Sequence, residues 1–281
     1  MFEKKLLSGK KILVTGGATG LGKSMGKRFL ELGAQLYICG RREEVLKQAA
    51  DELQKATGGT VKTFSCDVRD NQRVEAMIDA VWQDGPLDAL VNNAAGNFLC
   101  RTEELSIGAF EAVIGIVLMG TIHATMACGK RWIKEKRKAS VLSITTTYAQ
   151  WGSPYVVPSS VAKAGVLNLT RSLAVEWGKY GIRFNAIAPG PVPTEGAFSR
   201  LMPVKSLEEM AKKRNPLGRF GTHQELADLA AFLVSDQSGY VNGEQIVMDG
   251  GEQLKGASEF SHLGDLLTEE HWQMMKPKKK G

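Results

Sequence analysis

The residues with the clearest chemical signature are the glycines between Thr15 and Gly22, in the string Thr-Gly-Gly-Ala-Thr-Gly-Leu-Gly. A short apolar run, residues 12–14, precedes them, and a helix-length segment, residues 21–32, follows. At such a turn the backbone amides and the positive end of the helix form an anion site, and the lack of side chains lets a pyrophosphate approach. The string therefore predicts a dinucleotide site rather than a plain tight turn.

A pair of arginines indicates which nicotinamide dinucleotide is bound. A cofactor with a free 2′-hydroxyl usually meets an acid about 20 residues after the glycines, at the end of the second strand. Here that strand ends in Cys39-Gly40-Arg41-Arg42, without a carboxylate. Because a guanidinium group matches the dianionic 2′-phosphate, the sequence favours NADPH over NADH. The alternative is that both arginines only begin a solvated helix.

The elements that must position these groups alternate along most of the chain. The expected strands cover residues 12–14, 35–39, 61–64, 89–91, 141–144, 183–187 and 245–248. The expected helices cover residues 21–32, 43–56, 73–82, 109–128, 161–177 and 224–234. This alternation predicts a doubly wound parallel α/β sheet, a Rossmann fold, with helices on both faces. Asp67 would then reach the adenine edge, and Asn93 and Ala94 would line the adenosine ribose.

We expect one NADP-binding domain over residues 1–281, because no linker rich in Pro, Gly or Ser divides the chain. Two parts lie outside the regular alternation. They are a substrate-loop insertion at about residues 191–216 and a C-terminal tail at about residues 252–281. Thr222 and Glu225 form a capping-box pattern for the last of the expected helices.

The composition excludes several classes of protein. The 281 residues carry 36 Lys+Arg against 30 Asp+Glu, but the excess comes largely from the C-terminal end, so we expect no nucleic-acid partner. The terminal lysines are Lys276, Lys278, Lys279 and Lys280. No apolar run reaches about 18 residues, which argues against a transmembrane helix. The chain ends in Lys-Lys-Gly, which is not a peroxisomal address.

The cysteines indicate a compartment and argue against a metal centre. None of the four stands in a C-x-x-C pair, which is typical of reduced thiols in a cytoplasmic protein and not of a disulfide or metal framework. They are Cys39, Cys66, Cys100 and Cys128.

Together, these motifs resemble the short-chain dehydrogenase/reductase family. Besides the glycine string, the matching pieces are Asn92-Asn93-Ala94-Ala95-Gly96, Pro189-Gly190-Pro191 and Asp249-Gly250-Gly251. The resemblance covers about residues 10–251 and implies a catalytic tetrad of Asn, Ser, Tyr and Lys, with Tyr four residues before Lys on one helix face.

The chain departs from that tetrad. Lys163 fits, but Ser159 stands at the usual Tyr position, Thr146 at the usual Ser position and Val117 at the usual Asn position. A serine hydroxyl is a far weaker acid than a phenol. The chain is therefore either inactive or takes its phenol from elsewhere.

Two tyrosines lie close by in the sequence, Tyr148 and Tyr155. The end of a strand faces the ligand crevice in a doubly wound sheet, which favours Tyr148, although without the family it is equally well a packing aromatic. Strings such as Ser-Ile-Thr-Thr-Thr-Tyr (143–148) and Gly-Ala-Phe-Ser-Arg (196–200) resemble the mitochondrial-type 2,4-dienoyl-CoA reductase branch. That resemblance implies a phenol at Tyr148 with Asn97 as its partner, Lys163 on the nicotinamide ribose and Ser159 beside it.

The remaining site residues follow from the same comparison. The residues expected to bind NADPH are Gly16, Gly17, Ala18, Thr19, Gly20, Leu21, Arg41, Asp67, Asn93, Lys163, Pro189, Gly190, Pro191 and Val192. The residues expected to contact an acyl-CoA substrate are Arg41, Arg69, Phe98, Ser106 and Arg200. Taken singly, each arginine is as readily a surface ion pair, and Ser106 a helix N-cap.

The resemblance implies NADPH-dependent reduction of 2,4-dienoyl-CoA to 3-enoyl-CoA in the degradation of unsaturated fatty acids, by a homotetramer. The cysteine pattern and the lack of a long apolar run add the expectation of a cytoplasmic protein without membrane partners. One alternative is a reductase of the same fold that acts on ketoacyl thioesters or on alcohol/ketone pairs. The other is a protein that binds NADPH without catalysis.

Overall fold

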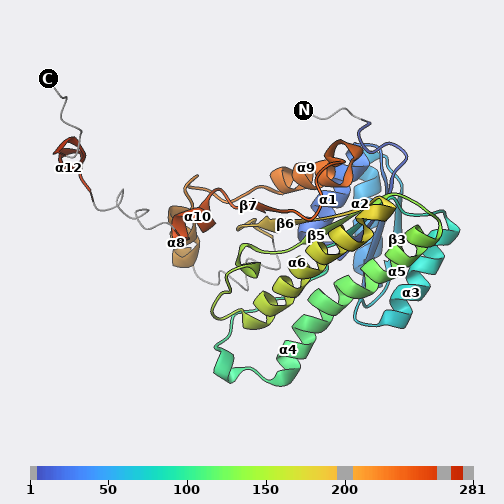
Figure 1. Cartoon of the computed structure of the whole chain (residues 1–281), viewed down its shortest axis with the longest axis horizontal. Helices are drawn as coiled ribbons and strands as arrows, with labels where there is room; N and C mark the ends of the chain where they lie inside the picture. The colour runs from blue at the N-terminus through green and yellow to red at the C-terminus, as the bar shows by residue number, and fades with distance from the viewer. Residues whose placement is uncertain (1–4, 195–204, 258–266, 275–281) are drawn as a thin grey trace.

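A computed structural model describes residues 5–194, 205–257 and 267–274 of the chain. Its centre is a parallel sheet with the strand order β3-β2-β1-β4-β5-β6-β7 (Figure 1). The strands are β1 (Lys11–Thr15), β2 (Gln35–Gly40), β3 (Val61–Ser65), β4 (Ala89–Asn92), β5 (Ala139–Ile144), β6 (Ile182–Pro189) and β7 (Gln245–Met248). The order reverses between β1 and β4, which opens a crevice at the carboxyl ends of these strands. The expected doubly wound fold is confirmed.

Helices cover both faces of the sheet. The longer ones are α1 (Gly20–Glu31), α2 (Glu43–Thr57), α3 (Asn71–Gln83), α4 (Ile107–Ile114), α5 (Gly120–Lys134), α6 (Val157–Trp177), α8 (Lys205–Arg214) and α9 (His223–Val234). The shorter ones include η1 (Thr102–Glu104), η2 (Gly115–Met119), η3 (Thr147–Ala149), η4 (Gly178–Tyr180), η5 (Asp236–Ser238), α10 (Glu252–Ala257) and α12 (Glu269–Met274). Helices α1, α2 and α9 pack into one core cluster, and α3, α5 and α6 into another, on opposite sides of the sheet (Figure 1).

The strands are apolar throughout because both of their faces are buried. In β1, Ile12 and Val14 belong to the cluster with α1, whereas Leu13 between them belongs to the cluster with α5. Successive side chains of a strand point to opposite faces, so a sheet covered on both sides needs continuous apolar runs.

The helix that follows β4 is longer than expected. It runs from Ile107 to Lys134 without a break and contains a π-helical turn, η2. By length and composition alone these 28 residues could cross a membrane, although Glu111 and His123 interrupt the apolar run within them. The carboxyl half of this helix packs against the sheet, where Ala124, Cys128 and Trp132 are fully buried, whereas only 28 % of its most apolar 18 residues are buried.

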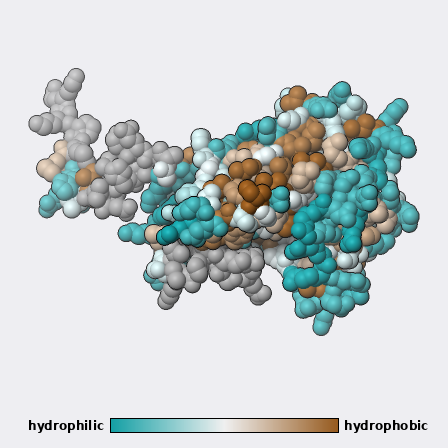
Figure 2. All heavy atoms as spheres, turned by 90° about the horizontal axis from the view of Figure 1, so that it is seen from below, coloured by the Kyte–Doolittle hydropathy of each residue, from teal (hydrophilic) through white to brown (hydrophobic). Residues whose placement is uncertain are grey.

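The same side of the molecule carries a hydrophobic area bordered by hydrophilic residues (Figure 2). Helices α4, α5 and α6 lie on this side in Figure 1. The helical segments on this side expose the apolar side chains of Ile107, Met119 and Val161. This face therefore offers apolar surface that the chain itself leaves uncovered.

Helix α6 begins at Val157, four residues earlier than expected, with a proline in its first turn. Proline suits this place because the first amides of a helix have no intrahelical acceptor. The early start places Ser159 and Lys163 on successive turns of one helix face, as their spacing predicts.

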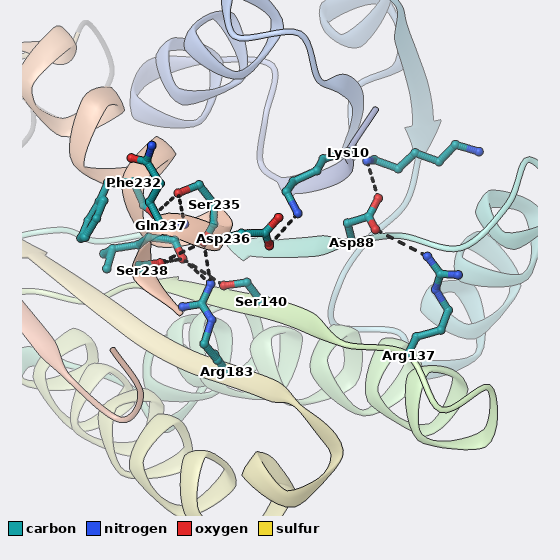
Figure 3. A network of polar contacts seen from close by, with 12 residues as sticks. Lys10, Asp88, Arg137, Ser140, Arg183, Phe232, Ser235, Asp236, Gln237 and Ser238 are labelled. Carbon is teal, nitrogen blue, oxygen red and sulfur yellow. Dashed lines mark hydrogen bonds and ion pairs between the residues drawn. The ribbon is translucent and has the colours of Figure 1, made fainter. Parts of the chain in front are cut away.

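At the amino ends of the strands, a network of polar contacts surrounds Arg183, near the start of β6 (Figure 3). Its guanidinium donates to the carbonyl oxygens of Leu233 (3.2 Å), Ser235 (2.9 Å) and Val241 (3.3 Å). Partial burial lowers the pKa of Arg183, and the charge of Asp236 opposes this effect. The arginine thus binds the last turn of α9, where the helix dipole favours a cation.

Candidate active site

The glycine string forms the expected turn between β1 and α1. Gly16 and Gly20 adopt left-handed conformations, with φ of 65° and 51°. Gly17 lies against Ile38, and a Cβ on it would stand 2.5 Å from an Ile38 methyl. Thr19 caps α1 without a side-chain hydrogen bond, so its hydroxyl does not occupy the first amides of the helix. These features fit a pyrophosphate at the amino end of α1.

Two residues from neighbouring strand ends hold this turn in place. The hydroxyl of Thr15 accepts from the backbone amides of Asn93 and Ala94, each at 3.0 Å. The side-chain amide of Asn93 donates to the carbonyl oxygens of Thr15 (3.0 Å) and Gly16 (3.2 Å). Asn93, expected beside the ribose, therefore has a structural contact with the glycine turn as well as a place in the larger of two cavities.

The smaller cavity has a volume of about 150 Å³ and lies beside the glycine turn. Arg41, Arg42 and Asp67 are part of its lining, together with Thr19 and Ala94. Two arginines at this place fit a 2′-phosphate, because β2 ends without a carboxylate that would repel the phosphate charge.

Asp67 has a partner that the sequence did not reveal. The guanidinium of Arg69 donates to both carboxylate oxygens, at 3.0 Å from Nε and 2.6 Å from Nη2. This contact lowers the pKa of Asp67, and the charge of Arg41 contributes to the shift. Arg69, expected to contact acyl-CoA, is thus an ion-pair partner of the residue expected at the adenine.

The expected phenol and its partner meet at the ends of β5 and β4. Tyr148 lies in η3, and the side-chain amide of Asn97 donates to its hydroxyl at 3.2 Å. The backbone amide of Phe98 donates to Asn97 Oδ1 at 2.9 Å, which determines the orientation of the side-chain amide. The Tyr148 hydroxyl also lies 3.3 Å from Ser159 Oγ. The structure therefore brings together three residues that the sequence assigned to catalysis.

Lys163 lies one helical turn beyond Ser159 and is only 6 % exposed. Its ammonium donates to the carbonyl oxygen of Ile144, at the end of β5. Burial lowers the pKa of Lys163 to about 8. A cation held here, with a free N–H, suits the hydroxyls of a ribose.

These groups share the larger cavity, which has a volume of about 880 Å³. Asn97, Tyr148, Ser159 and Lys163 line it, as do Pro189–Val192. Thr146, at the usual serine position, also lines it, and its buried hydroxyl has no hydrogen-bond partner among the residues that the structure describes. The cavity is large enough for a nicotinamide and part of a second ligand.

The outer wall of this cavity consists of residues that the sequence did not identify as part of the site. Trp151 and Leu254 line it while remaining 73 % and 72 % exposed. Further lining residues are Pro154, Arg214, Glu252, Gln253 and Gly256. The sequence signal for this wall is the Asp-Gly-Gly string (249–251) directly before α10, because two glycines allow the chain to turn back toward the cavity.

Asp249 places α10 against the cavity. Its carboxylate accepts from the backbone amides of Gly251 (2.8 Å) and Gln253 (2.7 Å), and its carbonyl accepts from Asn215 Nδ2 (2.7 Å). Arg214 and Glu252 stand 3.5 Å apart beside it. Part of the expected tail is therefore built into the site.

Three residues expected to contact acyl-CoA line neither cavity. Arg69 pairs with Asp67, Phe98 packs against a cluster that includes Val117, and Ser106 caps α4 by accepting from the Ala109 amide at 3.2 Å. Their role as substrate contacts stays a prediction, and Arg200 lies outside the described residues. Only the helix-capping interpretation of Ser106 is confirmed.

The chain is similar to known reductases in its sequence. The model of the family described as enoyl-(acyl carrier protein) reductase matches residues 16–253. A Caenorhabditis elegans protein named "Uncharacterized oxidoreductase F53C11.3" is 51 % identical over 274 residues, 95 % of this chain and 87 % of that protein. A second, "Probable 2,4-dienoyl-CoA reductase 3 [(3E)-enoyl-CoA-producing]", is 48 % identical over 93 % of this chain and 85 % of its own length.

A bacterial relative and two solved structures extend the comparison. The Bacillus subtilis "Probable 2,4-dienoyl-CoA reductase [(2E)-enoyl-CoA-producing]" is 48 % identical over 87 % of this chain and 97 % of its own. A short chain dehydrogenase from Bacillus anthracis superposes with a TM-score of 0.80 and 41 % identity, covering 89 % of this chain and 98 % of that one. A gluconate 5-dehydrogenase from Burkholderia cenocepacia, solved with NADP and tartrate, gives 0.84 and 28 %, with the same two coverages.

Proposed function

The chain belongs to the short-chain dehydrogenase/reductase family, and from this premise we propose that it reduces 2,4-dienoyl-CoA thioesters with NADPH in the degradation of unsaturated fatty acids. The observation that carries the proposal is the contact between Asn97 and Tyr148 in the larger cavity. Because Ser159 occupies the usual tyrosine position, the phenol must act from the end of β5 instead. Relatives named 2,4-dienoyl-CoA reductases support this substrate class.

NADPH is the proposed cofactor because the chain offers a place for each of its parts. The glycine turn fits the pyrophosphate, Arg41 and Arg42 fit the 2′-phosphate, and Lys163 fits the nicotinamide ribose. A nicotinamide cofactor is consistent with the structural relative that was solved in complex with NADP.

When bound, NADPH supplies a hydride to the δ carbon of the dienoyl thioester. The electron pairs of the two conjugated double bonds shift, and negative charge reaches the thioester oxygen as a dienolate. Tyr148 and Asn97 donate hydrogen bonds to that oxygen, so they stabilise the charge where it develops. Both donors are neutral groups. The donor of Asn97 is in position before the reaction, because the Phe98 amide already orients its side chain.

Lys163 and Ser159 have supporting roles in this scheme. The ammonium of Lys163, anchored on the Ile144 carbonyl, orients the ribose and adds positive potential next to the developing charge. The Ser159 hydroxyl lies 3.3 Å from the Tyr148 hydroxyl, and either of the two oxygens can act as the donor in this contact. Neither residue has to transfer a proton to a carbonyl, which explains how the chain can lack the usual tyrosine–lysine arrangement.

We propose that a proton from water then reaches the α carbon and gives a 3-enoyl-CoA. The relatives differ on this point, since one is named as (3E)-enoyl-CoA-producing and the bacterial one as (2E)-enoyl-CoA-producing. Protonation at the γ carbon of the same dienolate would give the 2-enoyl product. Both outcomes require the same Tyr148–Asn97 site.

The test is NADPH oxidation by the purified protein with dienoyl-, enoyl- and ketoacyl-CoA esters, with chromatographic identification of the product. Oxidation with dienoyl-CoA alone supports the proposal, and the product peak distinguishes 3-enoyl from 2-enoyl. Reduction of ketoacyl-CoA in preference to dienoyl-CoA would show a different reductase. NADPH binding without turnover on any ester would show a catalytically inactive protein.

We also propose a homotetramer in which second copies cover the face formed by α4, α5 and α6. This face exposes Ile107 and Met119 of the hydrophobic helix and Val161 of α6, and Figure 2 shows a hydrophobic area on the same side of the molecule. Light scattering of the purified protein tests this, and Met119→Glu should reduce the measured mass. A wild-type protein that is monomeric at micromolar concentration would contradict the proposal.

The proposed compartment is the cytoplasm, because Cys39, Cys66, Cys100 and Cys128 are all free thiols. Several relatives are named as peroxisomal enzymes, so peroxisomes are the competing location. Fractionation of cells that express the tagged full chain separates the two.

A further inference from the structure

His223, the first residue of α9, contacts two segments that are both expected to bind the cofactor. Its Nδ1 lies 2.6 Å from the hydroxyl of Ser24 in α1, and its Nε2 lies 2.5 Å from the carbonyl oxygen of Pro193. Ser24 follows the glycine turn by one helical turn, and its hydroxyl is also 3.2 Å from the carbonyl oxygen of Gly20. His223 therefore joins the pyrophosphate side of the site to the segment after β6.

The partners of His223 determine its tautomer. A carbonyl oxygen can only accept, so Nε2 carries a hydrogen and donates it to Pro193. In the neutral ring Nδ1 is then an acceptor, and the single hydrogen of the Ser24 hydroxyl points to Nδ1 at 2.6 Å in preference to the more distant Gly20 carbonyl at 3.2 Å. The imidazole is thus occupied on both sides and is neither a free base nor a free metal ligand.

The two segments that it joins face opposite halves of the proposed cofactor. The glycine turn lies beside the smaller cavity, where Arg41 is found, whereas Pro189–Val192 line the larger cavity with Lys163. Thr194 stands beside the glycine turn, with its methyl 3.5 Å from the position of a Cβ on Gly20. A displacement of Pro193 would therefore change the spacing between the two binding segments.

This contact is separate from the general packing of α1 on α9. The two helices are tied further along by Arg28, whose Nε donates to Asp228 Oδ1 at 2.6 Å. Leu226 and Ala230 of α9 are buried in the same core cluster as Met25 and Phe29 of α1. Docking of the helices does not depend on His223, so its contacts serve the position of the loop.

We propose that His223 is a positioning residue that keeps the nicotinamide-side segment in register with the pyrophosphate turn, so that both halves of the cofactor are bound as one unit. The inference rests on the proposed NADPH site and extends it to a residue outside both cavities. It predicts that the affinity for the cofactor depends on the His223–Pro193 hydrogen bond.

Two conservative variants separate the two contacts of His223. In His223→Gln the amide nitrogen lies about where Nε2 was and keeps a donor for Pro193, whereas His223→Asn keeps an acceptor for Ser24 but is too short for Pro193. The dissociation constant of NADPH is measured by fluorescence titration without substrate, together with kcat and KM for a dienoyl-CoA. We expect His223→Ala and His223→Asn to weaken NADPH about tenfold, and His223→Gln to stay within about threefold of wild type.

Asp228→Asn is the matched control, because it removes the ion pair with Arg28 that also links α1 to α9, and Asp228 lies outside both cavities. It should lower the melting temperature and leave NADPH affinity unchanged. Unchanged NADPH affinity in His223→Ala would overturn the inference, and so would equal weakening by Asp228→Asn or rescue by Asn rather than Gln. If wild-type protein does not bind NADPH, the proposed function itself fails.

Discussion

The side-chain amide of Asn97 donates to the hydroxyl of Tyr148 across 3.2 Å, although 51 residues separate the two in sequence. They meet because β4 and β5 are neighbours in the sheet and each residue follows the carboxyl end of its strand. The phenol accepts from Asn97, so its own hydrogen remains available for Ser159 or for a substrate oxygen. Both side chains can therefore donate to one anionic oxygen.

Tyr148→Phe should lower kcat about 10²–10³-fold, because one preorganised donor to the dienolate oxygen is lost. Affinity for NADPH should stay near the wild-type value, since the glycine turn, Arg41 and Lys163 are untouched. Stopped-flow or steady-state assays with a dienoyl-CoA measure the first, and fluorescence titration the second. Tyr155→Phe is the control, as this tyrosine is 57 % exposed in the following loop. Near-normal turnover of Tyr148→Phe would contradict the assignment.

Arg41→Asp should reverse the preference between the two nicotinamide cofactors. The carboxylate repels the 2′-phosphate and offers an acceptor to a free 2′-hydroxyl, so KM for NADPH should rise at least tenfold while KM for NADH falls. The ratio of kcat/KM for the two cofactors is the measurement. Arg73→Asp, on the exposed surface of α3, controls for the change in net charge. An unaltered ratio would show that Arg41 does not contact the 2′-position.

Lys163 gives the cofactor-free protein a defined pH dependence of stability. Burial lowers its pKa from 10.5 to about 8, so between these values the unfolded chain binds more protons than the folded one. The contribution of Lys163 to the free energy of unfolding should therefore rise with pH across this interval, by about 3 kcal/mol in total, whereas the raised thiol pKa values of Cys39, Cys66 and Cys128 act in the opposite direction above about pH 9. Below pH 8 the folded state carries the full cost of the buried cation. Urea titrations of wild type and Lys163→Met should show that the difference between their free energies of unfolding changes with pH from 8 to 10.5, because the thiols contribute equally to both proteins. A difference that is independent of pH would refute the explanation.

Arg183→Met should lower the free energy of unfolding by about 2–4 kcal/mol, because charged hydrogen bonds to three carbonyl oxygens are lost at once (Figure 3). Chemical denaturation gives the value. Arg73→Met is the matched control, since its side chain is 71 % exposed and should change stability by less than about 0.5 kcal/mol. Similar midpoints for the two variants would mean that Arg183 is not a structural anchor.

Trp151→Ala should weaken the binding of long-chain substrates more than the binding of short-chain substrates. Trp151 lies at the cavity with most of its indole exposed, so a long acyl chain can cover it and gain apolar contact. We expect KM for long-chain dienoyl-CoA to rise about fivefold and KM for a six-carbon ester to change little. A series of acyl lengths measures this, with the distant exposed residue Val175→Ala as the control. An equal rise at every length would place the acyl chain elsewhere.

Local patterns were enough to predict most of the framework. The apolar runs gave each strand to within about one or two residues, since a sheet buried on both faces needs such runs. The capping box of α9 formed as expected, because it depends only on Thr222 and Glu225 within one turn. The position of Tyr148 followed from the end of a strand and from the family resemblance.

Other features depended on contacts that no local pattern contains. The pairing of Arg69 with Asp67 arises in a loop whose conformation is set by the surrounding fold. Helix α10 lines the cavity because Asn215, far away in sequence, holds Asp249. The π-helical turn leaves the apolar pattern of its helix almost unchanged, so the sequence showed neither the turn nor the full length of the helix.

Helix α9 is held at its two ends by unrelated contacts. At its start, His223 hydrogen-bonds to Pro193 in the segment after β6, and at its end, Arg183 donates to the carbonyl oxygens of the last turn. Its 12 residues span about 18 Å and turn by about 100° per residue. Inserting or deleting one residue would rotate one end away from its partners while leaving the other in place. The length of this helix is thus far more constrained than its solvent-facing composition, which surface substitutions can vary freely.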